Sequence, residues 1–173
     1  MKKNILLIFA VMAGLMANAQ SSIGKTTPDG SGLLDFNSGG KSGIVLPWVT
    51  KLPTGAALTA GVLLYDANLK KVVYYNGTTW VDLSNHAGAV DVSLQTPLTE
   101  TLNGTVIGDS GIEESASSVQ GVLVLESSKK ALILPKVASP QNNIVKPMAG
   151  TICYDTVKKL VCVYNGTEWT FWK

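Results

Sequence analysis

The amino-acid sequence predicts an all-β protein made of two divergent copies of a small antiparallel β-meander module, joined by a polar linker. Three observations support this fold class. Short runs rich in Val, Ile, Thr and Tyr are bounded by Gly, Asn, Asp and Pro, as strands are. The 173-residue chain repeats itself at a spacing of 89 residues. Only 15% of its residues are charged and 46% are hydrophobic, unlike a disordered chain.

The first residues have the features of an export signal. Lys2 and Lys3 precede an apolar run over residues 5–16, which is too short to span a bilayer comfortably. Ala17-Asn18-Ala19 places small residues at both positions required for signal-peptide cleavage. We therefore expect residues 1–19 to be removed as a signal peptide, and we expect no membrane span in the mature chain.

The internal repeat defines the modules. The segment VLLYDANLKKVVYYNGTTW begins at Val62, and its counterpart TICYDTVKKLVCVYNGTEW begins at Thr151. Upstream, GIVLPWVT matches ALILPKVA, GLLDFNS matches GVLVLESS, and Ile23-Gly24 has an echo in Ile107-Gly108. The sequence therefore predicts a first β module over residues 20–84, a linker over residues 85–120 and a second β module over residues 121–173.

Each module is expected to contain a three-stranded meander. In the first copy, residues 62–66 and 71–75 form a hairpin around a four-residue loop, which places Leu64 opposite Val73. Asn76-Gly77 is typical of a two-residue type I′ turn leading into a third strand over residues 78–83. This register aligns Leu64 and Val73 with Trp80, and in the second copy it aligns Cys153 and Cys162 with Trp169.

Both faces of the first meander are partly apolar. A sheet that is wet on one side should alternate apolar with polar residues, and a three-stranded sheet has little core of its own. Either a second sheet and a loop cover the two faces, or one face packs against another subunit. The polar residues 85–120 are expected to be a partly extended connector with a short strand over residues 89–94, through which the copies need not touch.

The order of these motifs resembles a known module. IGKTTPDGSGLLDFNS is followed by KSGIVLPWVT and then by GVLLYDANLKKVVYYNGTTW. The chain is similar in this to a module of secreted and surface proteins of certain Gram-negative bacteria, related to phage tail-fibre segments. It departs from that pattern at Trp48 and Lys136, where Arg is usual, and the second copy lacks the TTPD segment. The resemblance implies an extracellular structural or adhesive role and carries no enzymatic function.

Composition excludes several other classes. All fourteen basic residues are Lys, and the net charge is only +2, which argues against a nucleic-acid-binding protein. One histidine, His86, and two cysteines leave little material for a metal site. No nucleophile, phosphate-loop or zinc-protease motif occurs. We therefore predict a protein that is not an enzyme, with no catalytic residues, no metal and no cofactor.

Several recurring polar residues have structural explanations. Asp66 and Asp155 begin hairpin loops, where Asp caps the turn by accepting backbone N–H groups, with calcium binding as the alternative. Asn76, Asn103 and Asn165 each begin an Asn-Gly-Thr sequence, for which a turn is the first explanation. Thr156, between Asp155 and Val157, fits a short O-glycosylation acceptor used in some of these bacteria.

Aromatic residues flank the Asn-Gly-Thr turns in both copies. Tyr75 with Trp80, and Tyr164 with Trp169, could form platforms for a sugar ring, although packing within the sheet is the more frequent role of strand aromatics. These four residues are the candidate ligand-binding aromatics.

The only two cysteines occupy the second copy. Cys153 and Cys162 correspond to Leu64 and Val73, so the hairpin register places them directly opposite each other. Opposed Cα atoms lie about 4.5 to 5.5 Å apart, which a disulfide accepts, and export would bring the pair into an oxidising compartment. We predict a Cys153–Cys162 disulfide; two buried thiols are the alternative.

These observations predict a secreted, non-enzymatic structural or adhesive component of the bacterial cell envelope, in the periplasm or at the outer surface. A carbohydrate-binding module that uses the Tyr and Trp pairs is the alternative. The expected partners are further copies of the same chain, with a trimer favoured, together with surface glycans or other envelope proteins.

The export signal gives the first testable prediction. Exported protein should begin at Gln20, because cleavage follows Ala19. N-terminal sequencing of the exported chain measures this, and a product that still carries Met1 would contradict it.

Overall fold

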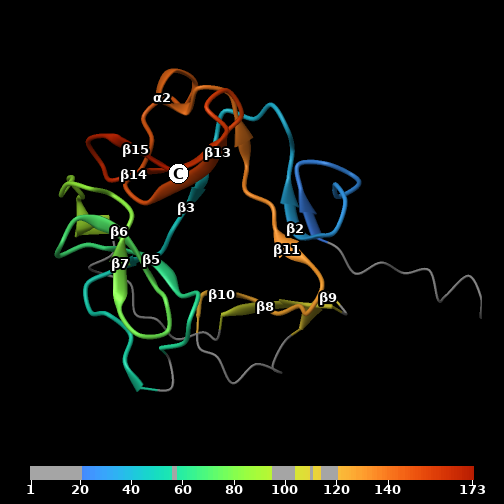
Figure 1. Ribbon diagram of the computed structural model, residues 1–173, viewed down its shortest axis with the longest axis horizontal. Coiled ribbons are helices and arrows are strands. Elements are labelled where there is room, and N and C mark those ends of the chain that lie inside the picture. The colour runs from blue at the N-terminus through green and yellow to red at the C-terminus, as the bar shows by residue number, and fades with distance from the viewer. Residues whose placement is uncertain (1–20, 56–57, 95–103, 110, 114–120) are drawn as a thin grey trace, which may run out of the picture.

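The computed structural model describes residues 21–55, 58–94, 104–109, 111–113 and 121–173 (Figure 1). Strands dominate these residues, and the helical elements among them include the short 3-10 helix η2 (Val92–Leu94) and the four-residue helix α2 (Pro140–Asn143). The predicted all-β fold class is therefore confirmed. The predicted signal peptide lies outside the described residues.

The first module contains the predicted meander. Strand β5 (Leu63–Asp66) pairs antiparallel with β6 (Lys71–Tyr75), which pairs antiparallel with β7 (Trp80–Asp82). Leu64 lies directly opposite Val73, as predicted. A short strand, β4 (Trp48–Val49), runs parallel to β5 and completes a four-stranded sheet.

The second module repeats this arrangement. Strands β13 (Thr151–Asp155), β14 (Leu160–Tyr164) and β15 (Trp169–Trp172) form its meander, and β12 (Lys136–Val137) runs parallel to β13 as β4 does to β5. One strand has no counterpart in the first sheet: β3 (Ile44–Val45) pairs antiparallel with Thr151 and Ile152 of β13. The second sheet therefore includes a strand from the first copy.

The first hairpin loop of each meander is capped by its aspartate. The Asp66 carboxylate accepts hydrogen bonds from the N–H groups of Asn68 (2.9 Å) and Leu69 (3.0 Å). The Asp155 carboxylate accepts the equivalent bonds from Val157 (2.8 Å) and Lys158 (3.2 Å). The predicted role of the two aspartates as turn caps is confirmed.

The second turn of each meander differs from the prediction. Trp80 lies opposite Tyr75, and Val73 lies opposite Asp82, so the loop has four residues instead of two. The Asn76 side chain causes this, because its Oδ1 accepts the N–H groups of Thr78 (2.9 Å) and Thr79 (2.8 Å) and so closes a wider loop. The predicted type I′ turn and the alignment of Trp80 with Val73 were wrong.

The same correction applies to the second copy. Trp169 lies opposite Tyr164, and Phe171 takes the predicted place of Trp169 opposite Cys162. Only Gly166 in this turn has a positive φ, of 101°, whereas a type I′ turn needs two such residues. Because the register moves by two residues, each tryptophan stays on its predicted face of the sheet.

The strands that precede the meanders also repeat. In the first copy β1 runs parallel to β2 with Ile23 opposite Phe36, and in the second copy β8 runs parallel to β10 with Ile107 opposite Leu125. The echo of Ile23-Gly24 in Ile107-Gly108 is thus a structural equivalence. The bounds of these strands and their neighbours are β1 (Ser21–Ile23), β2 (Gly32–Phe36), β8 (Thr105–Gly108), β9 (Gly111–Glu113), β10 (Leu123–Leu125) and β11 (Ala131–Leu132).

The expected linker carries more structure than the sequence indicated. Strands β8 and β9 lie within residues 85–120 and form a sheet with β10. The strand expected over residues 89–94 is absent, and η2 occupies its last three positions. Ile107 packs with Leu33 and Leu34 in one buried cluster, so the early strands of the two copies also contact each other.

A buried carboxylate makes the fold sensitive to acid. Asp155 is fully buried. Burial by itself raises the pKa of its carboxyl, but the N–H groups of Val157, Lys158 and Ser139 outweigh this and lower the pKa below its usual value. A carboxyl with a lowered folded-state pKa stabilises the fold above its unfolded-state pKa of about 3.9, and this stabilisation is lost as the pH falls through the folded-state value.

We therefore predict that Asp155→Asn lowers the free energy of unfolding at pH 7 and reduces the further loss between pH 7 and pH 3. Urea denaturation at both pH values measures this. Thr156→Ala, at the exposed neighbouring position, serves as the control and should keep the acid dependence of the unchanged chain. An unaltered acid dependence in Asp155→Asn would contradict the assignment.

Candidate assembly interface

The two meanders pack face to face around one apolar core. The first module contributes Leu46, Tyr65, Val72 and Leu83, and the second contributes Ala149, Ile152 and Val163, all less than a tenth exposed. Fully burying one large apolar side chain stabilises a fold by about 1.5 to 3 kcal/mol. Of the two alternatives left by the sequence, the second sheet covers this face of the first meander at Tyr65 and Val72, while Leu63 and Tyr74 on the same face are half-buried beside a pocket.

Polar contacts fix the orientation of the two modules. The Tyr65 hydroxyl donates to the carbonyl oxygen of Asn165 (2.8 Å), and the Trp48 indole N–H donates to that of Ala149 (2.7 Å). Burial, with a smaller effect from the charge of Asp66, raises the pKa of Tyr65 to about 12. The phenol therefore stays protonated and remains a hydrogen-bond donor at any physiological pH.

The chain that follows β7 crosses onto the second module. The carbonyl oxygen of His86 accepts a hydrogen bond from Asn165 Nδ2 (3.0 Å), and the Ala89 N–H donates to the carbonyl oxygen of Asn165 (3.2 Å). The His86 ring is exposed, as predicted, but it lies 2.8 Å from Glu168 Oε1. Sequence reasoning missed these contacts, because His86 lies in a polar segment without periodicity.

A close backbone contact holds this segment in place. A Cβ atom added to Gly88 would lie 1.8 Å from the carbonyl oxygen of Asn165, and one added to Gly166 would lie 1.7 Å from that of Ala89. Only glycine allows the two backbones to approach so closely.

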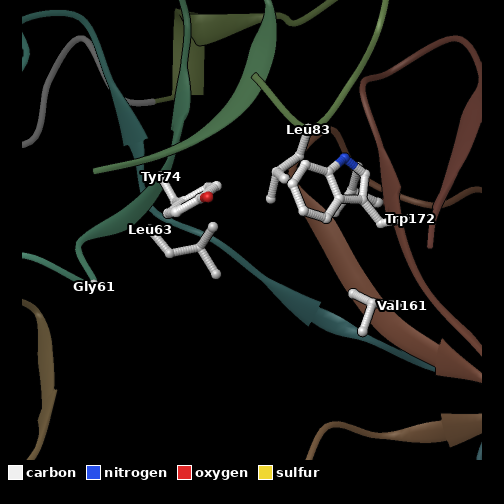
Figure 2. Close-up of a pocket in the computed structure, with 7 residues that line it drawn as sticks. Gly61, Leu63, Tyr74, Leu83, Val161 and Trp172 are labelled. Carbon is white, nitrogen blue, oxygen red and sulfur yellow. The ribbon is translucent and has the colours of Figure 1, made fainter. Parts of the chain in front are cut away.

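An apolar pocket opens between the modules. Its volume is about 340 Å³, and it is lined by Gly61, Leu63, Tyr74, Leu83, Val161, Val163 and Trp172. Figure 2 shows Leu63 and Tyr74 on one side of the pocket and Trp172 with Leu83 across from them. The rings of Tyr74 and Trp172 meet edge to face with centroids 6.2 Å apart. No charged side chain lines this pocket.

The cysteine pair occupies the opposite face of the second meander. Cys153 and Cys162 are directly opposed, as predicted, and are fully buried as thiols with sulfur atoms 3.4 Å apart. Trp169 packs against their cluster. The hydrogen bond with Cys162, burial and the charge of Asp155 raise the pKa of Cys153. The disulfide itself stays a prediction.

The position of the pair within the ladder affects its geometry. In the first copy, the Tyr75 N–H donates to the carbonyl oxygen of Val62 (2.8 Å). Antiparallel pairs alternate between hydrogen-bonded and non-hydrogen-bonded types, so Leu64 and Val73 form a hydrogen-bonded pair with Cα atoms about 5.5 Å apart. The equivalent cysteines lie in the same wider type of pair, which a disulfide still accepts.

The aromatic residues beside the turns pack against each other. The rings of Tyr75 and Trp80 have centroids 5.5 Å apart and are tilted by 53°, and those of Tyr164 and Trp169 are 5.3 Å apart and tilted by 45°. Rings tilted in this way contact each other and do not form one flat platform. Carbohydrate binding by these four residues stays a prediction.

The described residues contain neither a metal-binding cluster nor a membrane-spanning helix. Within them, no group of three or more His, Cys, Asp and Glu side chains could hold a metal ion. The same residues include no helix long and apolar enough to cross a membrane. Thr156, which fits a short O-glycosylation acceptor sequence, is exposed in its loop.

The fold and the interface define a two-module β protein whose apolar core lies between its modules and remains open at one side. Residues 22–102 and 111–173 match the family described as the phage tail like trimerisation region. The chain belongs to this family, which supports a structural, tail-fibre-like component that self-associates. No curated protein and no solved structure matches the chain.

The close approach at Gly88 gives a prediction for the interface. Gly88→Ala should lower the free energy of unfolding by about 1 to 3 kcal/mol, because the added methyl group overpacks against Asn165. Chemical denaturation measures the change. Gly40→Ala is a suitable control, since its Cβ would make only an ordinary contact, 3.7 Å from the carbonyl oxygen of Asn37. Equal effects of the two substitutions would contradict the role of Gly88.

The cysteine pair gives a second prediction. Natively exported protein, denatured without reduction, should show no free thiol, because Cys153 and Cys162 are opposed and export exposes them to oxidants. Thiol titration measures this, and the same sample after reduction should show two thiols per chain. Two free thiols before reduction would refute the disulfide.

Proposed function

We propose that the chain is a homotrimeric structural segment of an exported fibre or appendage on the bacterial cell envelope. The sequence supports export through the features of residues 1–19. Family membership supports self-association and a structural role. In this proposal the protein positions other parts of an assembly, and it does so through packing contacts between apolar side chains.

The apolar pocket is the observation that carries this proposal. Leu63, Tyr74 and Val161 are half-buried and Trp172 is 40% exposed, all around one uncharged opening. Monomeric proteins rarely leave large contiguous apolar patches in water, and such patches mark surfaces that bind other molecules. In a family of trimerisation regions, further copies of the chain are the occupants that this surface suits best.

The solution mass tests the proposal. Light scattering or sedimentation equilibrium of the exported chain should give three times the monomer mass at micromolar concentration. The mass should not change with moderate salt, because the pocket lacks charged side chains. A monomeric mass over the whole concentration range would reject the proposal.

A further inference from the structure

The contact between the two modules is closely packed on one side and open at the apolar pocket on the other. We define the docking half of the first module as Trp48, Tyr65, Val72 and Leu83, and the receiving half of the second module as Ala149, Ile152, Val163 and Asn165. Tyr65 donates to Asn165 and Trp48 donates to Ala149 across this contact. Because the two surfaces differ, the contact is heterologous, and each module should carry a further half that it leaves unused.

The repeat identifies these unused halves. The docking half of the second module consists of Lys136, Tyr154, Val161 and Trp172. The receiving half of the first module consists of Ala60, Leu63, Tyr74 and Asn76. Each residue is the sequence equivalent of one in the halves that are in contact.

Burial separates the used halves from the unused ones. Tyr65 and Val72 are 0% exposed, whereas their equivalents Tyr154 and Val161 are only half-buried. In the described residues, the Tyr154 hydroxyl finds no hydrogen-bond partner like the one that Tyr65 has.

The receiving halves show the same contrast. Ala149 and Asn165 are 6% and 0% exposed, whereas the equivalent Ala60 and Asn76 are exposed. Ile152 and Val163 are likewise buried, while Leu63 and Tyr74 are half-buried. Both unused halves border the apolar pocket, one through Leu63 and Tyr74 and the other through Val161 and Trp172 (Figure 2). Within the chain the two halves touch at the edge-to-face rings of Tyr74 and Trp172, and the pocket beside these rings stays open.

The strand pairing shows the same difference. In the used contact, Ile44 of β3 lies opposite Ile152 of β13. Their equivalents are Leu132 of β11 and Leu63 of β5. Among the described residues, β11 pairs only with β2. On the edge of β5 that pairs with β4 at Tyr65 and Asp66, none of the described strands lies beside Leu63. Among the described residues, the outer edge of β11 and the edge of β5 beside Leu63 therefore both lack a paired strand.

We propose that the docking half of the second module of one protomer packs on the receiving half of the first module of the next, so that the contact between subunits repeats the contact within the chain. Heterologous contacts of this kind close into rings when the rotation permits. Three chains would then arrange six similar modules around one axis, with their apolar faces inward. This inference rests on the proposed self-association and names the surface that produces it.

Cysteine cross-linking tests the predicted strand contact. In the used interface the equivalent positions are directly opposed, and opposed Cα atoms lie within the range of a disulfide. The double variant Leu63→Cys with Leu132→Cys, mildly oxidised, should run as a covalent trimer on a non-reducing denaturing gel. Each single variant should run as a monomer. A double variant that stays monomeric on this gel while the unchanged chain is trimeric in solution would overturn the inference.

A charge in the pocket provides the second test. Val161→Asp should weaken association at least tenfold, since truncating or disrupting a buried anchor at the centre of an interface typically has an effect of this size. Val145→Asp is the matched control, because Val145 is 81% exposed and does not line the pocket. Trp172→Ala is a milder variant to use if circular dichroism shows that Val161→Asp does not fold.

The outcomes distinguish the two proposals. The proposed contact surface is supported if the unchanged chain and Val145→Asp are both trimeric, while a pocket variant is monomeric and keeps the circular dichroism spectrum of a β protein. Trimeric pocket variants would overturn the surface and leave the trimer intact. A monomeric unchanged chain would overturn both.

Discussion

The structure depends on the burial of one meander face against another. A three-stranded sheet has two faces and too few residues to form a core alone. Tyr65 and Val72 on one sheet and Val163 on the other become almost wholly inaccessible only because the two sheets meet. The other contacts between the modules, such as those of Asn165 with the segment after β7, surround this apolar centre and set its orientation.

The two copies are interlocked and do not form independent domains. Strand β3 leaves the first copy to join the sheet of the second, and β11 of the second copy pairs with β2 of the first. Figure 1 shows β2 and β11 side by side although they lie far apart in the sequence. A duplicated sequence has thus produced one interlocked unit, in which equivalent segments make different contacts.

The sequence predicted most of what is local and little of what is long-range. Patterns within about ten residues predict the meander strands, the opposed pair Leu64 and Val73, and the aspartate caps. Each of these patterns occurs in both copies of the repeat, so each prediction had two independent examples. The wider Asn76 loop was missed because a side-chain hydrogen bond competes with the turn that Asn-Gly usually favours. The contact of His86 with Glu168 depends on how distant segments meet, and no periodic pattern encodes that.

The exchange of strands between copies also has a consequence for how the chain reaches this structure. The Trp48 indole bonds a carbonyl 101 residues further along the chain, and the Tyr65 hydroxyl bonds one 100 residues away. Proteins dominated by such non-local contacts fold slowly, because the entropy of closing long loops must be lost before the contacts form. The first sheet cannot bury its central residues until β13 and β14 have emerged. The apolar core between the two modules can therefore form only once the last strands of the chain are present.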